Sequence, residues 1–273
     1  MLMPIVMLLF VSFAVYFNAL LGDFVYDDTI QILENPWIKD ITNIPAIFSK
    51  SVWSFKAGPV ISNYYRPLMH IANMFSYYLF SLKPWGFHLV NVLFHCSVSV
   101  LVFLIIRRLL AGQNSSQLSI YHSPPLIAAL LFASHPIHTE AVTWIAGLPD
   151  VAFAFFYLCA LYLYTRAEAV RSGWYLGSLL CFTVAAFFKE PALTLPVILF
   201  AYDSLFCQGN RGVADYARRY IPYVGIGLGY LALRMHALGA FAPSKRHVIL
   251  TTYQYEVAGL AVLTTVILII HGE

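Results

Sequence analysis

The sequence predicts an all-α membrane protein with many transmembrane helices. Hydrophobic residues make up 60% of the 273 residues and charged residues only 11%, whereas about a quarter of the residues in a soluble domain are charged. The mean hydropathy is +0.73, and several apolar runs approach the roughly 20 residues that one membrane span requires. The net charge of +3 comes without a basic stripe, so we expect membrane lipid, and no nucleic acid, as a partner.

The apolar runs predict about eight transmembrane helices, and an aromatic fraction of 16% suits helices anchored at both membrane surfaces. The first run lacks the basic residues of a secretory signal, so we interpret it as a retained helix. Prolines interrupt the third and sixth runs. The four cysteines show no metal-ligand spacing and are interpreted as small core residues rather than disulfide partners. The expected helices cover residues 2–21, 87–106, 124–137, 149–165, 173–188, 191–206, 220–238 and 253–270.

The short loops on the two sides of the membrane differ in charge. Lys and Arg accumulate on the cytoplasmic side of membrane proteins, so the arginine-rich set of loops is predicted to be cytoplasmic. The long first loop, residues 22–86, then lies in the bacterial periplasm or the lumen, and the chain is a multi-pass protein of the bacterial inner membrane or the endoplasmic reticulum membrane. The cytoplasmic set holds Arg107, Arg108, Arg166, Arg171, Arg211, Arg218 and Arg219, and the opposite short loops hold Lys189, Lys245 and Arg246.

The first loop is predicted to contain two short helices. Thr42 or Asn43 can cap the first, with Pro45 near its first turn. Pro67 can begin the second, which extends to about Leu82 and carries an apolar stripe at helical spacing. We expect this second helix to lie in the membrane interface, with a buried re-entrant helix as the alternative. The stripe consists of Leu68, Ile71, Phe75, Leu79 and Leu82.

Three carboxylates, Asp23, Asp27 and Asp28, follow closely on the first apolar run. Acidic side chains at a membrane edge are costly to place and commonly belong to functional sites. We therefore predict a site here, with an acidic, solvated beginning of a loop as the alternative. Asp23 is expected to cap or anchor the loop, and Asp27 and Asp28 are the pair expected to carry chemistry.

The second span also places polar side chains toward the outer side. His88, Asn91 and His95 fall on one face of this helix. His88 is expected near the outer edge and His95 about two turns deeper. Hydrogen bonds to neighbouring helices are the alternative role for these side chains and the favoured one for His95.

The third span ends in a polar segment that contains His135, His138 and Glu140. The spacing differs from the familiar zinc-binding helix, and Pro136 lies between the histidines. A metal site is therefore the weaker interpretation. We favour a polar cluster that lines a pocket on the outer side.

Charged residues at the outer ends of later spans are candidates for binding an anionic headgroup. Arg66, Lys189 and Arg234 have the cationic groups that bind phosphate. Lys189 and Glu190 are adjacent and could instead pair with each other. Asp150 begins the fourth span on the same side.

Five motifs occur in an order that resembles a known family. They span roughly residues 10–205 and resemble the membrane part of the transmembrane and tetratricopeptide-repeat O-mannosyltransferases and their bacterial relatives, which are similar to the wider GT-C glycosyltransferases. The motifs are Gly22-Asp23-Phe24-Val25-Tyr26-Asp27-Asp28-Thr29, Tyr65-Arg66-Pro67-Leu68, Gly86-Phe87-His88-Leu89-Val90-Asn91-Val92, His135-Pro136-Ile137-His138-Thr139-Glu140-Ala141-Val142 and Lys189-Glu190.

The resemblance implies a single GT-C-like transmembrane domain over residues 1–273, with residues 22–86 as its catalytic outer loop. It implies a glycosyltransferase that moves a mannose-like sugar from a polyprenyl-phosphate donor to a hydroxyl acceptor, which in the nearest relatives is a protein Ser or Thr. The family's paired acid falls on Asp27 and Asp28, and either one is expected to be the base. No cofactor is firmly implied, and a divalent metal ion stays an option. Substrate-binding roles are expected for Arg66, His88, Asn91, His135, His138, Glu140, Lys189, Glu190 and Arg234.

The sequence also departs from this family. It has fewer expected helices than is usual for the class and no 34-residue repeat, so a truncated or split gene product is an expectation. A non-catalytic or degenerate membrane partner or scaffold of such an enzyme is the first alternative function. A lipid or solute transporter is the second, although transporters more often show paired repeats with broken helices, and no internal repeat is evident here.

Overall fold

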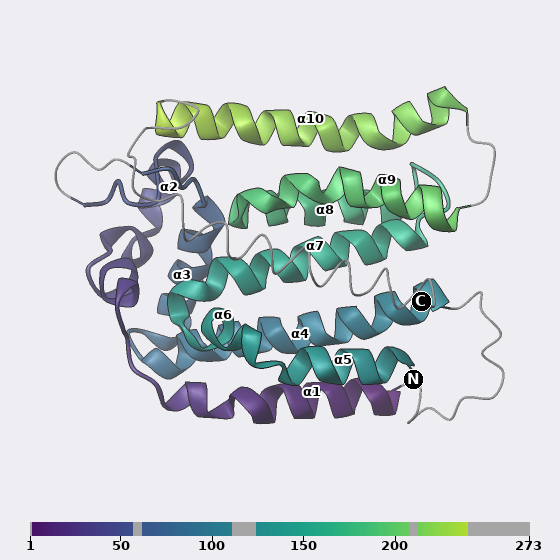
Figure 1. Ribbon diagram of the computed structural model, residues 1–273. Helices are drawn as coiled ribbons and strands as arrows, with labels where there is room; N and C mark the ends of the chain where they lie inside the picture. Colours follow the sequence, from purple (N-terminus) through teal and green to yellow (C-terminus); the bar gives the residue numbers. More distant parts are fainter. Residues whose placement is uncertain (1, 57–61, 111–123, 208–211, 240–273) are drawn as a thin grey trace.

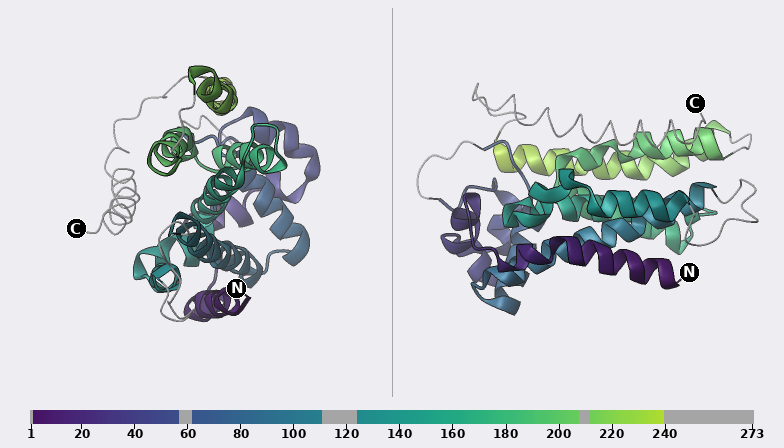
Figure 2. Two further views of the ribbon diagram at one scale, coloured as in Figure 1. Left: turned by 90° about the vertical axis from the view of Figure 1, so that its right-hand side faces the viewer. Right: turned by 60° about the horizontal axis from the view of Figure 1, so that its bottom comes forward.

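The computed structural model describes residues 2–56, 62–110, 124–207 and 212–239, and every regular element in these residues is helical. Long helices lie side by side along one direction (Figure 1), and the end-on view in Figure 2 shows α1 and α10 on opposite sides of the bundle. Most of the first loop is gathered at the end of the bundle that is at left in Figure 1. We call this the loop end, and the opposite end the far end.

Seven helices of the described residues form the bundle. The 3-10 helix η1 (Phe17–Leu21) continues the first one. The central helix α4 packs against α1, α5 and α7, while α7 packs against α8, and α10 contacts α8 and α9. The seven are α1 (Leu2–Tyr16), α4 (Pro84–Leu110), α5 (Pro124–Ser134), α7 (Leu148–Arg166), α8 (Gly173–Phe188), α9 (Leu195–Phe206) and α10 (Val213–Leu238).

Three helical stretches of the described residues are long and apolar enough to cross a membrane, and α5 and α8 are apolar but shorter. The membrane class is therefore supported, whereas the predicted eight spans are not confirmed. The last expected span, 253–270, lies outside the described residues. The three stretches are Leu2–Leu21, Pro84–Leu110 and Ile145–Arg166.

Proline placement explains where the sixth expected helix differs from the structure. The run 191–206 divides into the 3-10 helix η8 (Glu190–Thr194) and the α-helix α9, which begins at Leu195. Proline lacks the backbone N–H, so it fits best in the first turn of a helix, where that N–H has no partner within the helix. Pro196 occupies that first turn in α9. The seventh helix, α10, begins at Val213 rather than at residue 220 and contains Pro222 in its interior.

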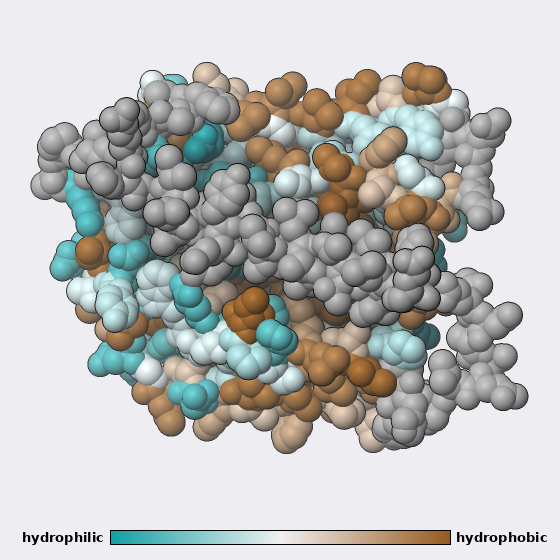
Figure 3. Space-filling model, viewed as in Figure 1, coloured by the Kyte–Doolittle hydropathy of each residue, from teal (hydrophilic) through white to brown (hydrophobic). Residues whose placement is uncertain are grey.

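The flanks of the bundle are apolar on the outside. On α1, Leu2 and Phe10 are 75% and 73% exposed. Figure 3 shows hydrophobic side chains along the bundle and hydrophilic ones gathered toward the loop end. An apolar flank of this extent suits contact with lipid, so the surface agrees with the membrane class.

The loop end contains short helices around a small apolar core. Both helices expected in the first loop are present, as α2 and α3. Their core includes Trp37, Ile38, Ile47, Met74 and Phe87. The elements are η2 (Thr29–Leu33, a π-helix), η3 (Pro36–Lys39), η4 (Ile41–Asn43), α2 (Ile44–Ser49), α3 (Pro67–Phe80), η6 (Pro136–His138), α6 (Thr139–Thr143) and η7 (Ile145–Gly147).

Asn43 occupies the capping position of α2, and Pro45 lies in the first turn of this helix, as expected. The 3-10 turn η4 directly precedes α2, and Asp40 caps η4 through its carboxylate, which accepts from the Thr42 N–H at 2.9 Å. Asn43 makes no side-chain capping bond at the beginning of α2.

The later part of the apolar stripe of α3 faces outward, whereas Leu68 and Ile71 are partly buried and pack against apolar clusters. Phe75 and Leu79 are 64% and 58% exposed, whereas His70 and Asn73 on the other side are buried. An exposed apolar stripe agrees with a helix that lies in the membrane interface.

Candidate active site at the loop end

Asp28 is fully buried and has both carboxylate oxygens engaged by the backbone. Oδ2 accepts from the Val25 N–H at 3.1 Å, and Oδ1 accepts from the Ala146 N–H at 2.8 Å. Burial raises the pKa of Asp28 to about 6, although the two backbone hydrogen bonds oppose this shift. Asp28 therefore ties the first loop to η7, on a segment 118 residues away.

The chain makes a tight turn immediately before Asp28. The Asp28 N–H donates to the Val25 carbonyl at 3.0 Å, which closes a four-residue turn with Tyr26 and Asp27 in its centre. Tyr26 has a positive φ of 50°. Asp27 is half-buried. The two acids therefore differ, because one is enclosed by the turn and the other lies at its tip.

Asp23 and His88 shape the chain just before this turn. Asp23 accepts from the Phe24 N–H at 2.8 Å, as expected for a residue that anchors the loop. His88 on α4 is 3% exposed and lies beneath Gly22, where a Cβ atom would be 3.0 Å from the His88 Nε2. Its ring faces the backbone of Asp23 and Thr143 without a hydrogen bond of good geometry. His88 thus supports the loop from below.

Asn91 and His95 both form hydrogen bonds to neighbouring segments, which was the favoured interpretation for His95 and the alternative one for Asn91. The Asn91 amide donates to the Trp144 carbonyl at 2.7 Å, and Nε2 of His95 lies 3.0 Å from the Ala133 carbonyl. Both side chains are buried. They connect α4 to neighbouring segments rather than opening into a pocket.

The two histidines around η6 contact each other edge to face, with 6.2 Å between the centroids of the His135 and His138 rings. His135 is exposed, and its Nδ1 accepts from the Ile137 N–H at 3.2 Å. The His138 ring packs on Phe132, with 4.3 Å between the ring centroids. Glu140 is exposed in the first turn of α6. Within residues 2–56, 62–110, 124–207 and 212–239, no three His, Cys, Asp or Glu side chains are grouped to hold a metal ion.

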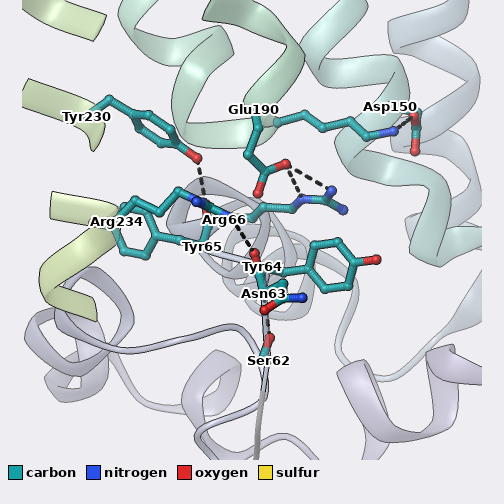
Figure 4. A network of polar contacts seen from close by, with 10 residues as sticks. Ser62, Asn63, Tyr64, Tyr65, Arg66, Asp150, Glu190, Tyr230 and Arg234 are labelled. Carbon is teal, nitrogen blue, oxygen red and sulfur yellow. Dashed lines mark hydrogen bonds and ion pairs between the residues drawn. The ribbon is translucent and has the colours of Figure 1, made fainter. Parts of the chain in front are cut away.

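Two ion pairs lie at the loop end, where α7 begins and α8 ends (Figure 4). Arg66 donates to Glu190 through Nε at 3.3 Å and Nη2 at 3.1 Å, and Lys189 pairs with Asp150. Lys189 and Glu190 therefore do not pair with each other. The reason is the extended backbone at Lys189, with φ −156° and ψ 139°, which sends successive side chains to opposite sides.

Arg234 reaches the same region from α10. Its Nη2 donates to the Asn63 carbonyl at 2.9 Å, and Tyr230 on the same helix donates to the Tyr65 carbonyl at 3.2 Å. Arg66 also lies over the Tyr64 ring, 4.5 Å from its centroid. Figure 4 shows Arg66, Glu190 and Arg234 in one polar network. The three cations predicted from the sequence are thus brought to one region.

The sequence analysis missed a buried acid at the far end. Asp203 is 1% exposed and accepts from the hydroxyls of Tyr164 at 2.7 Å and Tyr220 at 2.9 Å. The sequence feature that could have indicated this residue is a lone carboxylate within an apolar run. Asp203 connects α7, α9 and α10. A pocket of about 250 Å³ also lies at this end, lined by Glu168, Ala169, Val170, Asp215, Arg218 and Arg219.

The cysteines agree only in part with their interpretation as core residues, because Cys96 is buried whereas Cys159, Cys181 and Cys207 are half-buried. All four lie in the described residues and are free thiols.

Fold and site together define an all-helical membrane protein. Its two adjacent acids and the three cations Arg66, Lys189 and Arg234 gather at one end of the bundle. Comparison with known proteins specifies the family. Over 201 residues, 72% of this chain, it is 35% identical to protein O-mannosyl-transferase TMTC3 of Homo sapiens. It is 36% identical to TMTC2 of Homo sapiens over 70% of the chain and 34% identical to TMTC4 of Homo sapiens over 67%.

The chain is thus homologous to the transmembrane and tetratricopeptide-repeat O-mannosyltransferase family, which confirms the resemblance carried by its motifs. It spans about a fifth of the length of the first relatives, 21% for TMTC3 and 22% for TMTC2. No protein-family profile matches the chain. No solved structure matches it either.

Proposed function

We propose that this chain is a GT-C type glycosyltransferase that moves a mannose-like sugar from a polyprenyl-phosphate donor to a Ser or Thr hydroxyl of a protein. The reaction would take place at the loop end, on the periplasmic or lumenal side of the membrane. The sugar and the protein acceptor are supported by the relatives, which are named protein O-mannosyl-transferases. The observation that carries the proposal is the difference in surroundings between Asp28, whose two buried oxygens accept backbone N–H groups, and Asp27, which is half-buried.

Asp27 is the proposed base. An inverting transfer needs a carboxylate within about 3 Å of the acceptor hydroxyl to take its proton. Both oxygens of Asp28 already accept backbone hydrogen bonds in a buried position. Asp27, at the tip of the turn, is half-buried. Asp28 then fixes the turn that presents the carboxylate of Asp27 to the acceptor.

Arg66, Lys189 and Arg234 are the proposed phosphate-binding residues. The leaving phosphate needs cationic groups where its negative charge grows. A guanidinium has five N–H donors, so the two bonds from Arg66 to Glu190 leave further donors for a phosphate. In this proposal Glu190 and Asp150 hold their cations in place until the donor binds.

The sugar is proposed to contact the segment that precedes η7. His135, His138 and Glu140 lie on η6 and α6, directly before the Ala146 N–H that holds Asp28. Histidine and carboxylate side chains can donate to and accept from sugar hydroxyls. His88 and Asn91 are assigned the different role of supporting the loop and α4, because both are buried.

The test is sugar transfer by the purified chain in lipid nanodiscs. Radiolabelled mannose is offered as polyprenyl-phosphate mannose or as a nucleotide sugar, together with a Ser- and Thr-containing peptide. We expect label in the peptide with the lipid donor only. Arg66→Gln should raise the KM for the donor, and Lys83→Gln, which alters another cation of the first loop, serves as its control. Transfer from the nucleotide sugar alone would contradict the proposed donor.

A non-catalytic membrane partner of such an enzyme is the second candidate. It is favoured by the ion pairs Arg66–Glu190 and Lys189–Asp150, because each cation already has an anionic partner within the chain. This candidate predicts binding of the lipid donor without turnover by the chain alone. Addition of a partner polypeptide would then restore transfer.

A further inference from the structure

Tyr26 is unusual both in its backbone and in its surroundings. Its φ of 50° lies in the left-handed region, which residues other than glycine, asparagine and aspartate rarely adopt. Its side chain is 87% exposed, although it is a large aromatic group. The local fold therefore keeps a disfavoured backbone conformation at a residue whose ring is mostly uncovered.

The turn is held by bonds that do not involve the Tyr26 ring. Asp28 donates its N–H to the Val25 carbonyl and accepts from the Val25 N–H, while the Thr29 N–H donates to the Tyr26 carbonyl at 3.3 Å. The bond from the Ala146 N–H to Asp28 adds a connection to η7. A disfavoured conformation persists where the surroundings over-determine it, and such positions cluster at functional sites. The ring is therefore not needed to build this turn.

The position of Tyr26 constrains what can reach Asp27. Consecutive Cα atoms are about 3.8 Å apart, so an acceptor whose hydroxyl lies within bonding distance of the Asp27 carboxylate must pass close to Tyr26. Two apolar residues that precede Tyr26 in the chain are exposed as well, since Val25 is 45% and Leu21 is 81% exposed. Exposed apolar and aromatic side chains thus directly precede the proposed base in the chain.

We propose that Tyr26 is the docking position for the acceptor polypeptide, which binds as an extended segment with its Ser or Thr hydroxyl at Asp27. This inference rests on the proposed function and specifies how its acceptor is recognised. Tyrosine offers a large, rigid contact surface with few rotatable bonds, and it is enriched where proteins bind peptides and other proteins. Burial of the ring in lipid is disfavoured here, because it would draw the neighbouring Asp27 toward a medium where carboxylates are costly.

The test measures binding of a fluorescein-labelled Ser- and Thr-containing peptide to the full chain, without donor. Tyr26→Gly removes the ring, and glycine adopts a positive φ without strain, so the turn and the unfolding temperature should be kept. We expect Tyr26→Gly to weaken peptide binding about tenfold or more, as the loss of an aromatic anchor commonly does. Tyr26→Phe should retain most of the affinity, and Phe75→Ala, at a 64% exposed aromatic of α3, should bind as wild type.

The test distinguishes failure of the docking role from failure of the proposed sugar transfer. Equal peptide affinity of Tyr26→Gly and wild type would overturn the docking role and would assign the ring to the membrane surface. Peptide binding that depends on Tyr26, in a chain that transfers no sugar from polyprenyl-phosphate mannose, would support docking and refute the proposed transfer. In an active chain, Tyr26→Gly should raise the KM for the peptide and leave the KM for the donor unchanged.

Discussion

At the residue scale, hydrogen bonds fix the protonation state of His70 in the first loop. Asn35 accepts from the Trp37 N–H through Oδ1, which turns its Nδ2 toward the Nδ1 of His70 at 3.2 Å. Nδ1 of His70 must therefore accept, and Nε2 carries the proton, 3.0 Å from the Val52 carbonyl. The ring is neutral, and its burial lowers the pKa of His70 to about 4.

A neutral, buried His70 predicts loss of stability in acid. Because its pKa is depressed from 6.5, the stabilisation is present above pH 6.5 and disappears as the pH falls through about 4. The full effect is about 3 kcal/mol, at about 1.4 kcal/mol per pKa unit. We expect wild type to lose its advantage over His70→Gln across this window, measured by unfolding in detergent. A constant difference between the two proteins from pH 7 to pH 4 would contradict this.

Asp28 predicts the opposite dependence of stability on pH. Its pKa is raised from 3.8 to about 6 by burial, so its stabilisation is present below pH 3.8 and is lost as the pH rises through about 6. The effect is again about 3 kcal/mol. The stability of wild type relative to Asp28→Asn should therefore fall between pH 4 and pH 6, in the window where the His70 contribution grows. An increase over this range would show that the carboxylate is stabilised when charged.

The sequence predicted the acidic pair as a candidate site but not the different surroundings of its two members. Asp27 and Asp28 are neighbours of the same type, so spacing cannot distinguish them. The difference arises from the Ala146 N–H, which belongs to a segment 118 residues away. The same holds for Arg66, whose partner Glu190 is 124 residues distant. Such pairs depend on how α7, α8 and the first loop pack, and that packing is not written in local spacing.

At the element scale, local sequence predicted helices well where caps and prolines mark their ends. Helix α8 spans Gly173–Phe188, matching the expected 173–188, and the Ser172 side chain caps it by accepting from the Tyr175 N–H at 3.2 Å. The polar beginning of α10 was missed, because its first turns contain Asp215, Arg218 and Arg219 and lie before the apolar part. Hydrophobicity identifies the part of a helix that faces lipid or the protein core. It does not mark polar turns by which the helix extends beyond that apolar part.

Close packing at the beginning of α7 predicts a sensitive glycine. A Cβ atom on Gly147 would lie 2.6 Å from the Ala141 carbonyl oxygen, which is backbone and cannot turn aside. Gly147→Ala should therefore lower the unfolding temperature and disturb the neighbouring Ala146 bond to Asp28. Gly225→Ala is the matched control, because nothing lies within 4 Å of its Cβ position inside α10. There alanine should stabilise the helix by up to about 1 kcal/mol. Equal effects at the two glycines would contradict this packing.

At the scale of the whole molecule, antiparallel helices collect distant residues at one end. Helix α1 ends, α4 and α7 begin, and α8 and α10 end at the loop end (Figure 1). Asp27, His88, Asp150, Lys189 and Arg234 consequently lie at the same end although they are spread along the chain. The sequence predicted this by counting alternating helices. This gathering of residues depends on the direction of each described helix. It does not depend on the number of membrane spans, which is not confirmed.

The arginines at the far end predict the orientation of the protein in the membrane. Exposed arginines there include Arg107, Arg166 and Arg171, and positive residues favour the cytoplasmic side. With the native cysteines replaced by alanine, Lys50→Cys at the loop end should react with a membrane-impermeant maleimide from the periplasm or lumen. Arg171→Cys at the far end should react only from the cytoplasmic side. The reverse labelling would invert the sidedness of the proposed reaction.

The central claim is that Asp27 acts as the base and Asp28 holds it in place. The most direct measurement is the rate of mannose transfer from polyprenyl-phosphate mannose to peptide by Asp27→Asn and by Asp28→Asn, with unfolding temperatures recorded in parallel. If the assignment is right, Asp27→Asn lowers kcat by about a hundredfold or more, the usual contribution of a general base, with an unchanged unfolding temperature and a smaller loss in Asp28→Asn. Full activity of Asp27→Asn, together with an inactive but folded Asp28→Asn, would contradict it.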